Sequence, residues 1–302
     1  RLCPLRAPLT AKTIIMANIR NMKKSPIFDR KTFLLVTGAS RGLGRSLAVN
    51  LAKKLGKQSF ILLLARNKDG LEETKTQILK NVPDLELTIS LQPVDLSQCS
   101  DALFDRLLKD TMTTAHADFQ CFNQVIIVHN AASLGDVSKK VSDFMDAAEY
   151  QEYWNVNITS PAILNNVFLH HFPASEKRDV LCINISSICA LQPFKTWALY
   201  CTGKTARDMW FNVLAVEEPS IRVLSYAPGP LDTDMQMLAR TVTGDNDMRE
   251  VFLDMHQKGG LLTCDVSVKK LIQILETNTF ESGAHIDYFD VSDTASEKTN
   301  NS

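Results

Sequence analysis

The 302-residue chain lacks the features that mark several classes of protein. No run of 18 apolar residues occurs, so no membrane span is predicted. Its 33 basic and 34 acidic residues give a formal net charge of −1, which argues against a dedicated nucleic-acid binder. Its seven cysteines include no CxxC pair, which favours a reducing, cytoplasmic location with thiols buried as small hydrophobes. The adjacent pair His170-His171 has no third ligand nearby, and no metal site is expected.

The two ends of the chain differ from its middle. Residues 1–28 carry six Lys or Arg and no acidic residue, a pattern compatible with a mitochondrial transit peptide. The preferred interpretation is a disordered leader or translated upstream sequence, since Met16 and Met22 are possible starts. Residues 291–302 are rich in Ser, Thr, Asn and Asp and are expected to form a polar tail. One domain is therefore expected over residues 29–290.

The middle of the chain, which is apolar enough for a sizeable core, alternates apolar runs with helical patterns. Leu43, Leu47, Leu51 and Leu55 share one helical face, and a second helix is expected near 70–80. The apolar runs lie at 33–37, 60–65, 87–92, 125–128, 180–185, 223–227 and 284–289. This alternation predicts a single-domain α/β fold, a doubly wound (Rossmann-type) parallel sheet of about seven strands with helices on both faces. Ligands of such sheets bind beyond the carboxyl ends of the strands.

A glycine-rich turn follows the first predicted strand. Residues 37–44 read TGASRGLG, and glycine lets the backbone approach a pyrophosphate closely. The helix that begins there offers free N–H groups to an anion. The spacing is GxxxGxG rather than the common GxGxxG, so an ordinary strand-to-helix turn is the alternative interpretation.

The end of the second predicted strand indicates which dinucleotide is bound. An acidic residue there would bind the adenosine ribose and repel a 2′-phosphate. This chain has Arg66 and Asn67 instead, and Arg41 lies in the glycine-rich turn. Two arginine forks favour NADPH over NADH. The alternative is that both arginines are solvated surface charges.

A Ser–Tyr–Lys pattern follows the fifth predicted strand. Tyr200 stands thirteen residues after Ser187, and Lys204 lies one helical turn further along the same face. A nearby ammonium is expected to lower the pKa of the phenol. Tyr200 could then protonate a carbonyl oxygen as hydride reaches the carbon, while Ser187 holds that oxygen.

These motifs, in the order TGASRGLG, NAA, NISS, YxxxK and a Pro-Gly loop, resemble the short-chain dehydrogenase/reductase family over nearly the whole segment 31–290. Longer runs at 133–138, 189–195, 226–235 and 282–287 resemble a branch of that family that reduces ketones on pterin side chains, in the final steps of tetrahydrobiopterin synthesis. His129 and Ala132 depart from the family's usual NNAG, which puts cofactor affinity in doubt. A packed strand-end histidine is the preferred interpretation of His129.

The resemblance implies roles for individual residues. For NADP(H) it implies Gly38, Ala39, Ser40, Arg41, Gly42, Leu43 and Gly44 at the pyrophosphate, Arg66, Asn67, Asp95 and Leu96 at the adenosine, and Asn130, Lys204, Leu231, Asp232, Thr233, Asp234, Met235 and Gln236 toward the nicotinamide. It implies a catalytic set of Ser187, Tyr200, Lys204 and Asn157, and a pterin pocket of Ser187, Ile188, Tyr200, Gly229 and Asp287. It also implies a homodimer.

Two further residues can be argued from their own chemistry. The Asp287 carboxylate could accept paired hydrogen bonds from the amino-pyrimidinone edge of a pterin, although a strand-edge acid facing water is the alternative. Pro161 has no N–H, so the carbonyl of Asn157 could be free to hold a water that relays protons to Lys204. A simple proline kink is equally compatible with this spacing.

Three functions are weighed. The first is NADPH-dependent reduction of pterin side-chain ketones, and the second is the same chemistry on general ketones and diketones. The third is a catalytically silent, cofactor-binding regulator, against which the intact set of Ser187, Tyr200, Lys204 and Asn157 argues.

Overall fold

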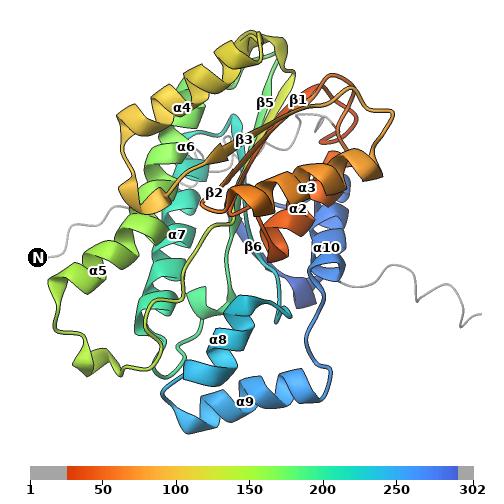
Figure 1. Ribbon diagram of the computed structural model, residues 1–302. Coiled ribbons are helices and arrows are strands. Elements are labelled where there is room, and N and C mark those ends of the chain that lie inside the picture. Colours follow the sequence, from red (N-terminus) through yellow and green to blue (C-terminus); the bar gives the residue numbers. More distant parts are fainter. Residues whose placement is uncertain (1–25, 292–302) are drawn as a thin grey trace, which may run out of the picture.

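The computed structural model describes residues 26–291, and the leader and tail predicted at the two ends lie almost wholly outside this range. Seven strands alternate with helices along the chain (Figure 1). The strands are β1 (Thr32–Thr37), β2 (Phe60–Ala65), β3 (Thr88–Pro93), β4 (Gln124–His129), β5 (Asp179–Ile185), β6 (Ile221–Ala227) and β7 (Ala284–Asp287). The longer helices are α2 (Gly42–Ala52), α3 (Lys68–Asn81), α4 (Asp101–Thr114), α5 (Ala147–Trp154), α6 (Ser160–His171), α7 (Ala198–Glu217), α8 (Asp234–Val242), α9 (Asn246–Gln257) and α10 (Cys264–Thr277).

All seven strands pair in parallel in the order β3-β2-β1-β4-β5-β6-β7. The order reverses between β1 and β4, and such a switch point is where open α/β sheets bind their ligands. The predicted doubly wound sheet is confirmed. The strands are mostly apolar on both faces, because helices cover both faces and leave few positions in water.

Two apolar layers hold the helices against the sheet. Leu34 and Val36 of β1 point toward α2, α3 and α10, and their neighbours Phe33 and Leu35 point toward α4, α6 and α7. Figure 1 shows these helix groups on opposite sides of the sheet. The first layer also includes Ile27, a residue of the segment assigned to the leader. No helix within residues 26–291 is both long and apolar enough to cross a bilayer.

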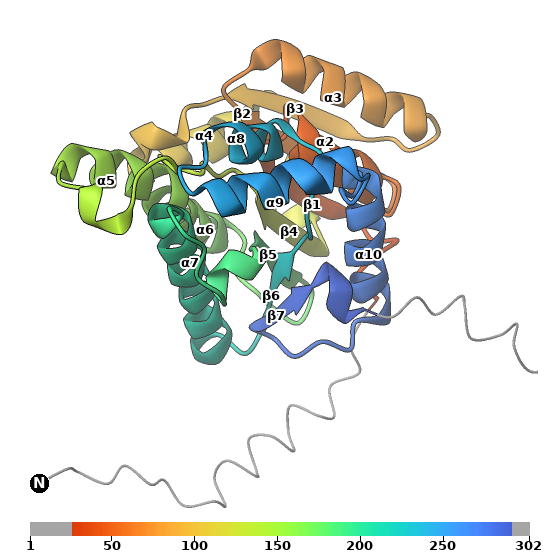
Figure 2. The ribbon, with the colours of Figure 1, turned by 90° about the horizontal axis from the view of Figure 1, so that it is seen from below.

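Helices α8 and α9 belong to neither layer. Figures 1 and 2 place them together at one end of the sheet, where the chain leaves β6 and before it enters α10. The strand expected at 284–289 ends at Asp287, because Asp287 and Asp290 cap a short 3₁₀ turn over Tyr288–Asp290. This turn places Asp287 at the carboxyl end of the sheet.

Candidate active site

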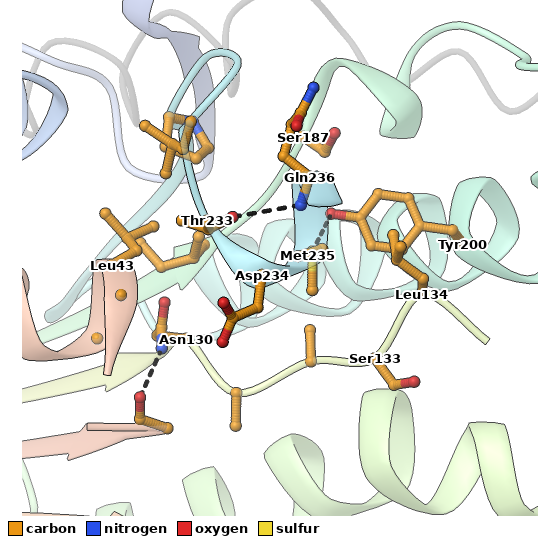
Figure 3. Close-up of a pocket in the computed structure, with 18 of the residues that line it drawn as sticks. Leu43, Asn130, Ser133, Leu134, Ser187, Tyr200, Thr233, Asp234, Met235 and Gln236 are labelled. Atoms are coloured by element: carbon orange, nitrogen blue, oxygen red, sulfur yellow. Dashed lines mark hydrogen bonds between the residues drawn. The ribbon is translucent and has the colours of Figure 1, made fainter. Parts of the chain in front are cut away.

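A large cleft opens where the carboxyl ends of the strands meet α8 and α9, and Figure 3 shows part of its lining. Its volume is about 1900 Å³. Pockets for one drug-sized molecule measure roughly 300–1000 Å³, so this cleft has room for a dinucleotide and a second small molecule. All of the residues assigned from the sequence to cofactor and substrate line it except Ala39, whose side chain is buried in the core.

The glycine-rich turn forms one wall of the cleft. Gly38 has a φ of +66°, a conformation that favours glycine. A Cβ on Gly44 would lie 2.1 Å from the Gly38 carbonyl oxygen, so no side chain fits there. The Asn130 amide at the end of β4 donates to the Thr37 carbonyl at 3.0 Å and ties β4 to the turn. Asn130 thus sets the shape of the turn.

The amino-terminal end of α2 is suited to an anion. Its N-cap residue, Arg41, makes no side-chain capping bond, and the first turn holds no acidic residue. The first N–H groups of the helix therefore face the cleft with a partial positive charge. These observations fit the phosphates of a dinucleotide, which Gly38 through Gly44 would hold.

The residues predicted at the adenosine end also shape the backbone. Asn67 accepts a hydrogen bond from Gly70 N at 2.9 Å and caps α3. Asp95 accepts one from Ser97 N at 3.0 Å, and this bond lowers the pKa of its carboxyl, with a smaller contribution from Arg66. The Arg66 side chain is exposed and lines the cleft.

Arg41, the second predicted phosphate ligand, forms an ion pair with Asp234 in the first turn of α8. This pair crosses the cleft from the glycine-rich turn to the cover formed by α8. Both side chains remain more than half exposed, so solvent screens the pair and its contribution to stability is small. Arg41 can therefore exchange Asp234 for a phosphate at little cost.

Three residues of the predicted catalytic set, Ser187, Tyr200 and Lys204, come together on α7 and the loop after β5. Lys204 lies with its Nζ 5.5 Å from the centre of the Tyr200 ring and donates to the Ile185 carbonyl at 2.6 Å. Ser187 lies beside the phenol and accepts a hydrogen bond from Cys189 N at 3.2 Å. Figure 3 shows the phenol directed at Met235 of α8, and its hydroxyl donates to Met235 Sδ at 3.9 Å.

The electrostatics of this set differ from the expectation that Lys204 acidifies the phenol. Burial raises the pKa of Tyr200, and the neighbouring Ser187 offsets only part of that effect. Burial, followed by the charge of Arg207, holds the pKa of Lys204 well below its ordinary value. The Lys204 ammonium lies over the face of the ring and bonds a carbonyl instead of the phenol oxygen, so its influence on the phenol is weak. Tyr200 is consequently a protonated phenol at neutral pH.

Asn157 lies in a π-helical turn over Asn155–Thr159. Ser160 N donates to the Asn155 carbonyl, five residues back, because Pro161 cannot continue the ordinary pattern. The buried Asn157 amide accepts from Ser133 N at 2.9 Å and donates to the Tyr153 carbonyl at 3.0 Å. Its side chain thus holds the loop after β4 against the helix.

The predicted substrate residues all line the same cleft as the glycine-rich turn. Asp287 accepts a hydrogen bond from Phe289 N at 3.0 Å and still lines the cleft. Gly229 has a φ of +74°, and a Cβ there would lie 2.9 Å from Leu262 Cδ1. Ile188 is a partly exposed apolar side chain in the lining.

Two aromatic rings close the cleft near Tyr200. The ring of Trp197 packs edge-on against Tyr200 with centres 5.4 Å apart, and stacks on Phe252 of α9 at 5.0 Å. Phe252 and Met255 of the same helix also line the cleft, and neither was expected from the sequence. The signal available was the amphipathic pattern of 246–257, which predicts a helix but not its partner.

His129 is a packed strand-end histidine, and its burial predicts a pH-dependent stability. Burial is the main cause that lowers its pKa from 6.5 to about 3. In the unfolded chain His129 therefore binds a proton as the pH falls below 6.5, whereas in the folded chain it stays neutral down to about pH 3. The folded state consequently loses stability as the pH falls below 6.5. The expected loss is about 2 kcal/mol by pH 5.

This loss can be measured by urea unfolding at pH 7.5 and pH 5. We expect His129→Leu to reduce the difference between the two pH values, and the matched change His170→Leu, at an exposed histidine, to leave it unchanged. An equal difference in His129→Leu and the unsubstituted chain would contradict the assignment.

The comparisons with known proteins agree with this geometry. Residues 32–243 match the short chain dehydrogenase family. The chain belongs to that family, whose members are oxidoreductases. It is 44% identical to sepiapterin reductase of Bos taurus over 86% of this chain and 95% of the relative. It is 43% identical to the Mus musculus protein of the same name, over 85% and 96%.

Other relatives and structures extend the likeness. Benzil reductase of Bacillus subtilis is 26% identical over 81% of this chain and 93% of its own length. The crystal structure of the KRED1-Pglu enzyme superposes with a TM-score of 0.68 at 25% identity, covering 84% of this chain and 100% of that chain. A short chain dehydrogenase from Shigella flexneri, complexed with NADP, shares the fold at a TM-score of 0.68 and 21% identity, covering 88% of this chain and all of that one.

Proposed function

We propose that this protein uses NADPH to reduce a ketone on the side chain of a pterin, with sepiapterin as the representative substrate. One observation carries the proposal. A single cleft holds the glycine-rich turn and helix end suited to phosphates, the Ser187–Tyr200–Lys204 set and the Asp287 carboxylate. The similarity to sepiapterin reductases supplies the substrate class.

The proton chemistry follows from the burial of Tyr200. When bound, the reduced nicotinamide supplies a hydride to the carbonyl carbon. A phenol that stays protonated at neutral pH can give its proton to the carbonyl oxygen, so the ketone becomes an alcohol. Ser187 holds that oxygen in place. Lys204, whose Nζ lies over the ring at 5.5 Å from its centre, is proposed to return a proton from water to the phenolate oxygen.

Asn157 is the fourth member of the proposed catalytic set. Its side chain holds the loop after β4, which lines the cleft. Its main-chain carbonyl, in the π-helical turn before Pro161, is proposed to hold the water that supplies Lys204. Asn157 is therefore proposed to affect the reaction rate by supplying protons to Lys204 through this water.

The preference for NADPH rests on Arg66 and Arg41, which line the adenosine side of the cleft. Reversing one of these charges should oppose a 2′-phosphate. We expect Arg66→Asp to raise the KM for NADPH by about tenfold or more and to narrow the preference over NADH. The matched control is Arg106→Asp, at an exposed arginine on α4 outside the cleft lining. Equal KM values for both cofactors in the unsubstituted protein would refute the preference.

The substrate proposal is tested by following NADPH absorbance with sepiapterin and with benzil, a diketone without a pterin ring. We expect the kcat/KM for sepiapterin to exceed that for benzil by about a hundredfold. Turnover of benzil alone would instead establish the second candidate, a broad diketone reductase, which the likeness to benzil reductases favours.

The proposed assembly is a homodimer in the cytoplasm. Four apolar side chains on one stretch of α7 are exposed: Met209, Trp210, Val213 and Val216. Such a strip is typical of a subunit interface. The six cysteines within residues 26–291 are free, as a reducing compartment would leave them.

A further inference from the structure

A partly buried carboxylate lies behind the proposed catalytic set. Asp208 follows Lys204 by one turn of α7 and its side chain is 16% exposed. It accepts hydrogen bonds from Asn184 Nδ2 at 2.8 Å, Ser186 Oγ at 2.8 Å and His285 Nδ1 at 2.6 Å. Its donors come from β5, the loop after β5, and β7. One side chain on α7 thus joins the end of β5 to β7, which lies about 100 residues later in the sequence.

Two of these donors adjoin residues of the proposed site. Ser186 immediately precedes Ser187. His285 pairs in register with Ser225 of β6, two positions before Asp287, so His285 and Asp287 share one face of the sheet. Neither Asp208 nor His285 lines the cleft within the described part of the chain. They lie behind its wall.

Arg207 completes the network on its other side. Its guanidinium, fully buried, donates to Asn184 Oδ1 at 3.0 Å and to the carbonyls of His129 at 2.6 Å and Ala131 at 3.2 Å. The positive charge balances the Asp208 carboxylate in the interior, as buried charges require. Because Arg207 is part of the core, it is unsuitable for a test of function.

Strand β7 needs such a support. It is an edge strand of four residues, and within residues 26–291 it pairs only with β6. His285 is the residue of β7 whose side chain bonds to α7, and its other ring nitrogen has no hydrogen-bond partner in the described chain. The orientation of the ring therefore depends on Asp208.

We propose that Asp208 and His285 are positioning residues that fix the distance between the Asp287 carboxylate and the Tyr200–Ser187 pair. This inference rests on the proposed function and deepens it, since it explains how a pterin held at one end presents its ketone at the other. The bond between His285 and Asp208 therefore affects binding of a substrate that contacts both Asp287 and the Tyr200–Ser187 pair. It does not matter for a ketone that contacts only Tyr200 and Ser187.

The test compares sepiapterin with benzil in His285→Phe, which keeps a ring and removes the donor. We expect the KM for sepiapterin to rise about five- to tenfold, with kcat for both substrates and the KM for benzil within twofold. His285→Asn, which restores a donor near the position of Nδ1, should recover most of the sepiapterin KM. The matched control is His171→Phe, since His171 makes the same kind of bond to Asp105 at 2.8 Å, at the end of α6.

If His285→Phe raised the KM for sepiapterin and for benzil equally, or changed neither KM, the inference would be overturned while the proposed function stayed intact. A His285→Asn variant that behaves like His285→Phe would have the same consequence. Absence of sepiapterin turnover in the unsubstituted protein would overturn both proposals. Should His285→Phe fail to fold, His285→Val takes its place, because valine suits a strand and has no donor.

Discussion

Tyr200→Phe is expected to lower kcat for ketone reduction by about a thousandfold, since general acid catalysis contributes roughly 10²–10⁴ in rate. The change removes one oxygen from a buried ring whose hydroxyl donates only weakly to Met235 Sδ. Packing against Trp197 is retained. We therefore expect the dissociation constant for NADPH, measured by fluorescence titration, to stay within about twofold.

The matched control is Tyr226→Phe. Tyr226 is also buried, and its hydroxyl donates to the Ser267 carbonyl at 2.9 Å, on the α10 side of the sheet. Loss of this hydrogen bond in Tyr226→Phe should lower the free energy of unfolding by about 1 kcal/mol and leave kcat unchanged. A Tyr200→Phe enzyme that retains a tenth or more of the kcat would show that the proton comes from another group.

Asp287→Ala is expected to reduce kcat/KM for sepiapterin by about a hundredfold and that for benzil by no more than about threefold, because hydrogen bonds to a charged group are worth roughly 1.5–3 kcal/mol. The two values are measured by following NADPH absorbance. The carboxylate also caps the turn after β7 through Phe289 N. Alanine therefore removes a structural bond together with the charge.

Asp287→Asn separates these two effects. Asparagine is as good a capping residue as aspartate, so the turn is retained while the charge is lost. We expect this variant to lose most of the sepiapterin turnover as well. If Asp287→Asn were as active as the unsubstituted enzyme, the carboxylate would act only through the turn and the proposed pterin anchor would be wrong.

Much of the fold could be predicted because its signals are local. Each buried parallel strand is a continuous apolar run, and the run at Phe60–Ala65 became β2 with the predicted ends. The pair Tyr200 and Lys204 share a face because the helix repeats every 3.6 residues. The glycine-rich turn is set by positions where a Cβ has no space, such as Gly44.

The remaining features depend on contacts between distant segments. Nothing near Phe252 indicates that α9 folds over Trp197, which lies 55 residues earlier. Arg207 and Asp208 follow Lys204 directly, and charged side chains on a helix are usually solvated, so the sequence does not distinguish them from surface residues. The pKa of Tyr200 also escaped prediction, because it depends on burial as well as on the neighbouring lysine.

The central claim is that a ketone on a pterin side chain receives hydride directly within this cleft. The measurement that tests it most directly is reduction of sepiapterin with NADPH that carries deuterium at both C4 positions of the nicotinamide, followed by mass spectrometry and NMR of the product. We expect one deuterium on the side-chain carbinol carbon. A product without deuterium, or with deuterium on the pterin ring, would contradict it.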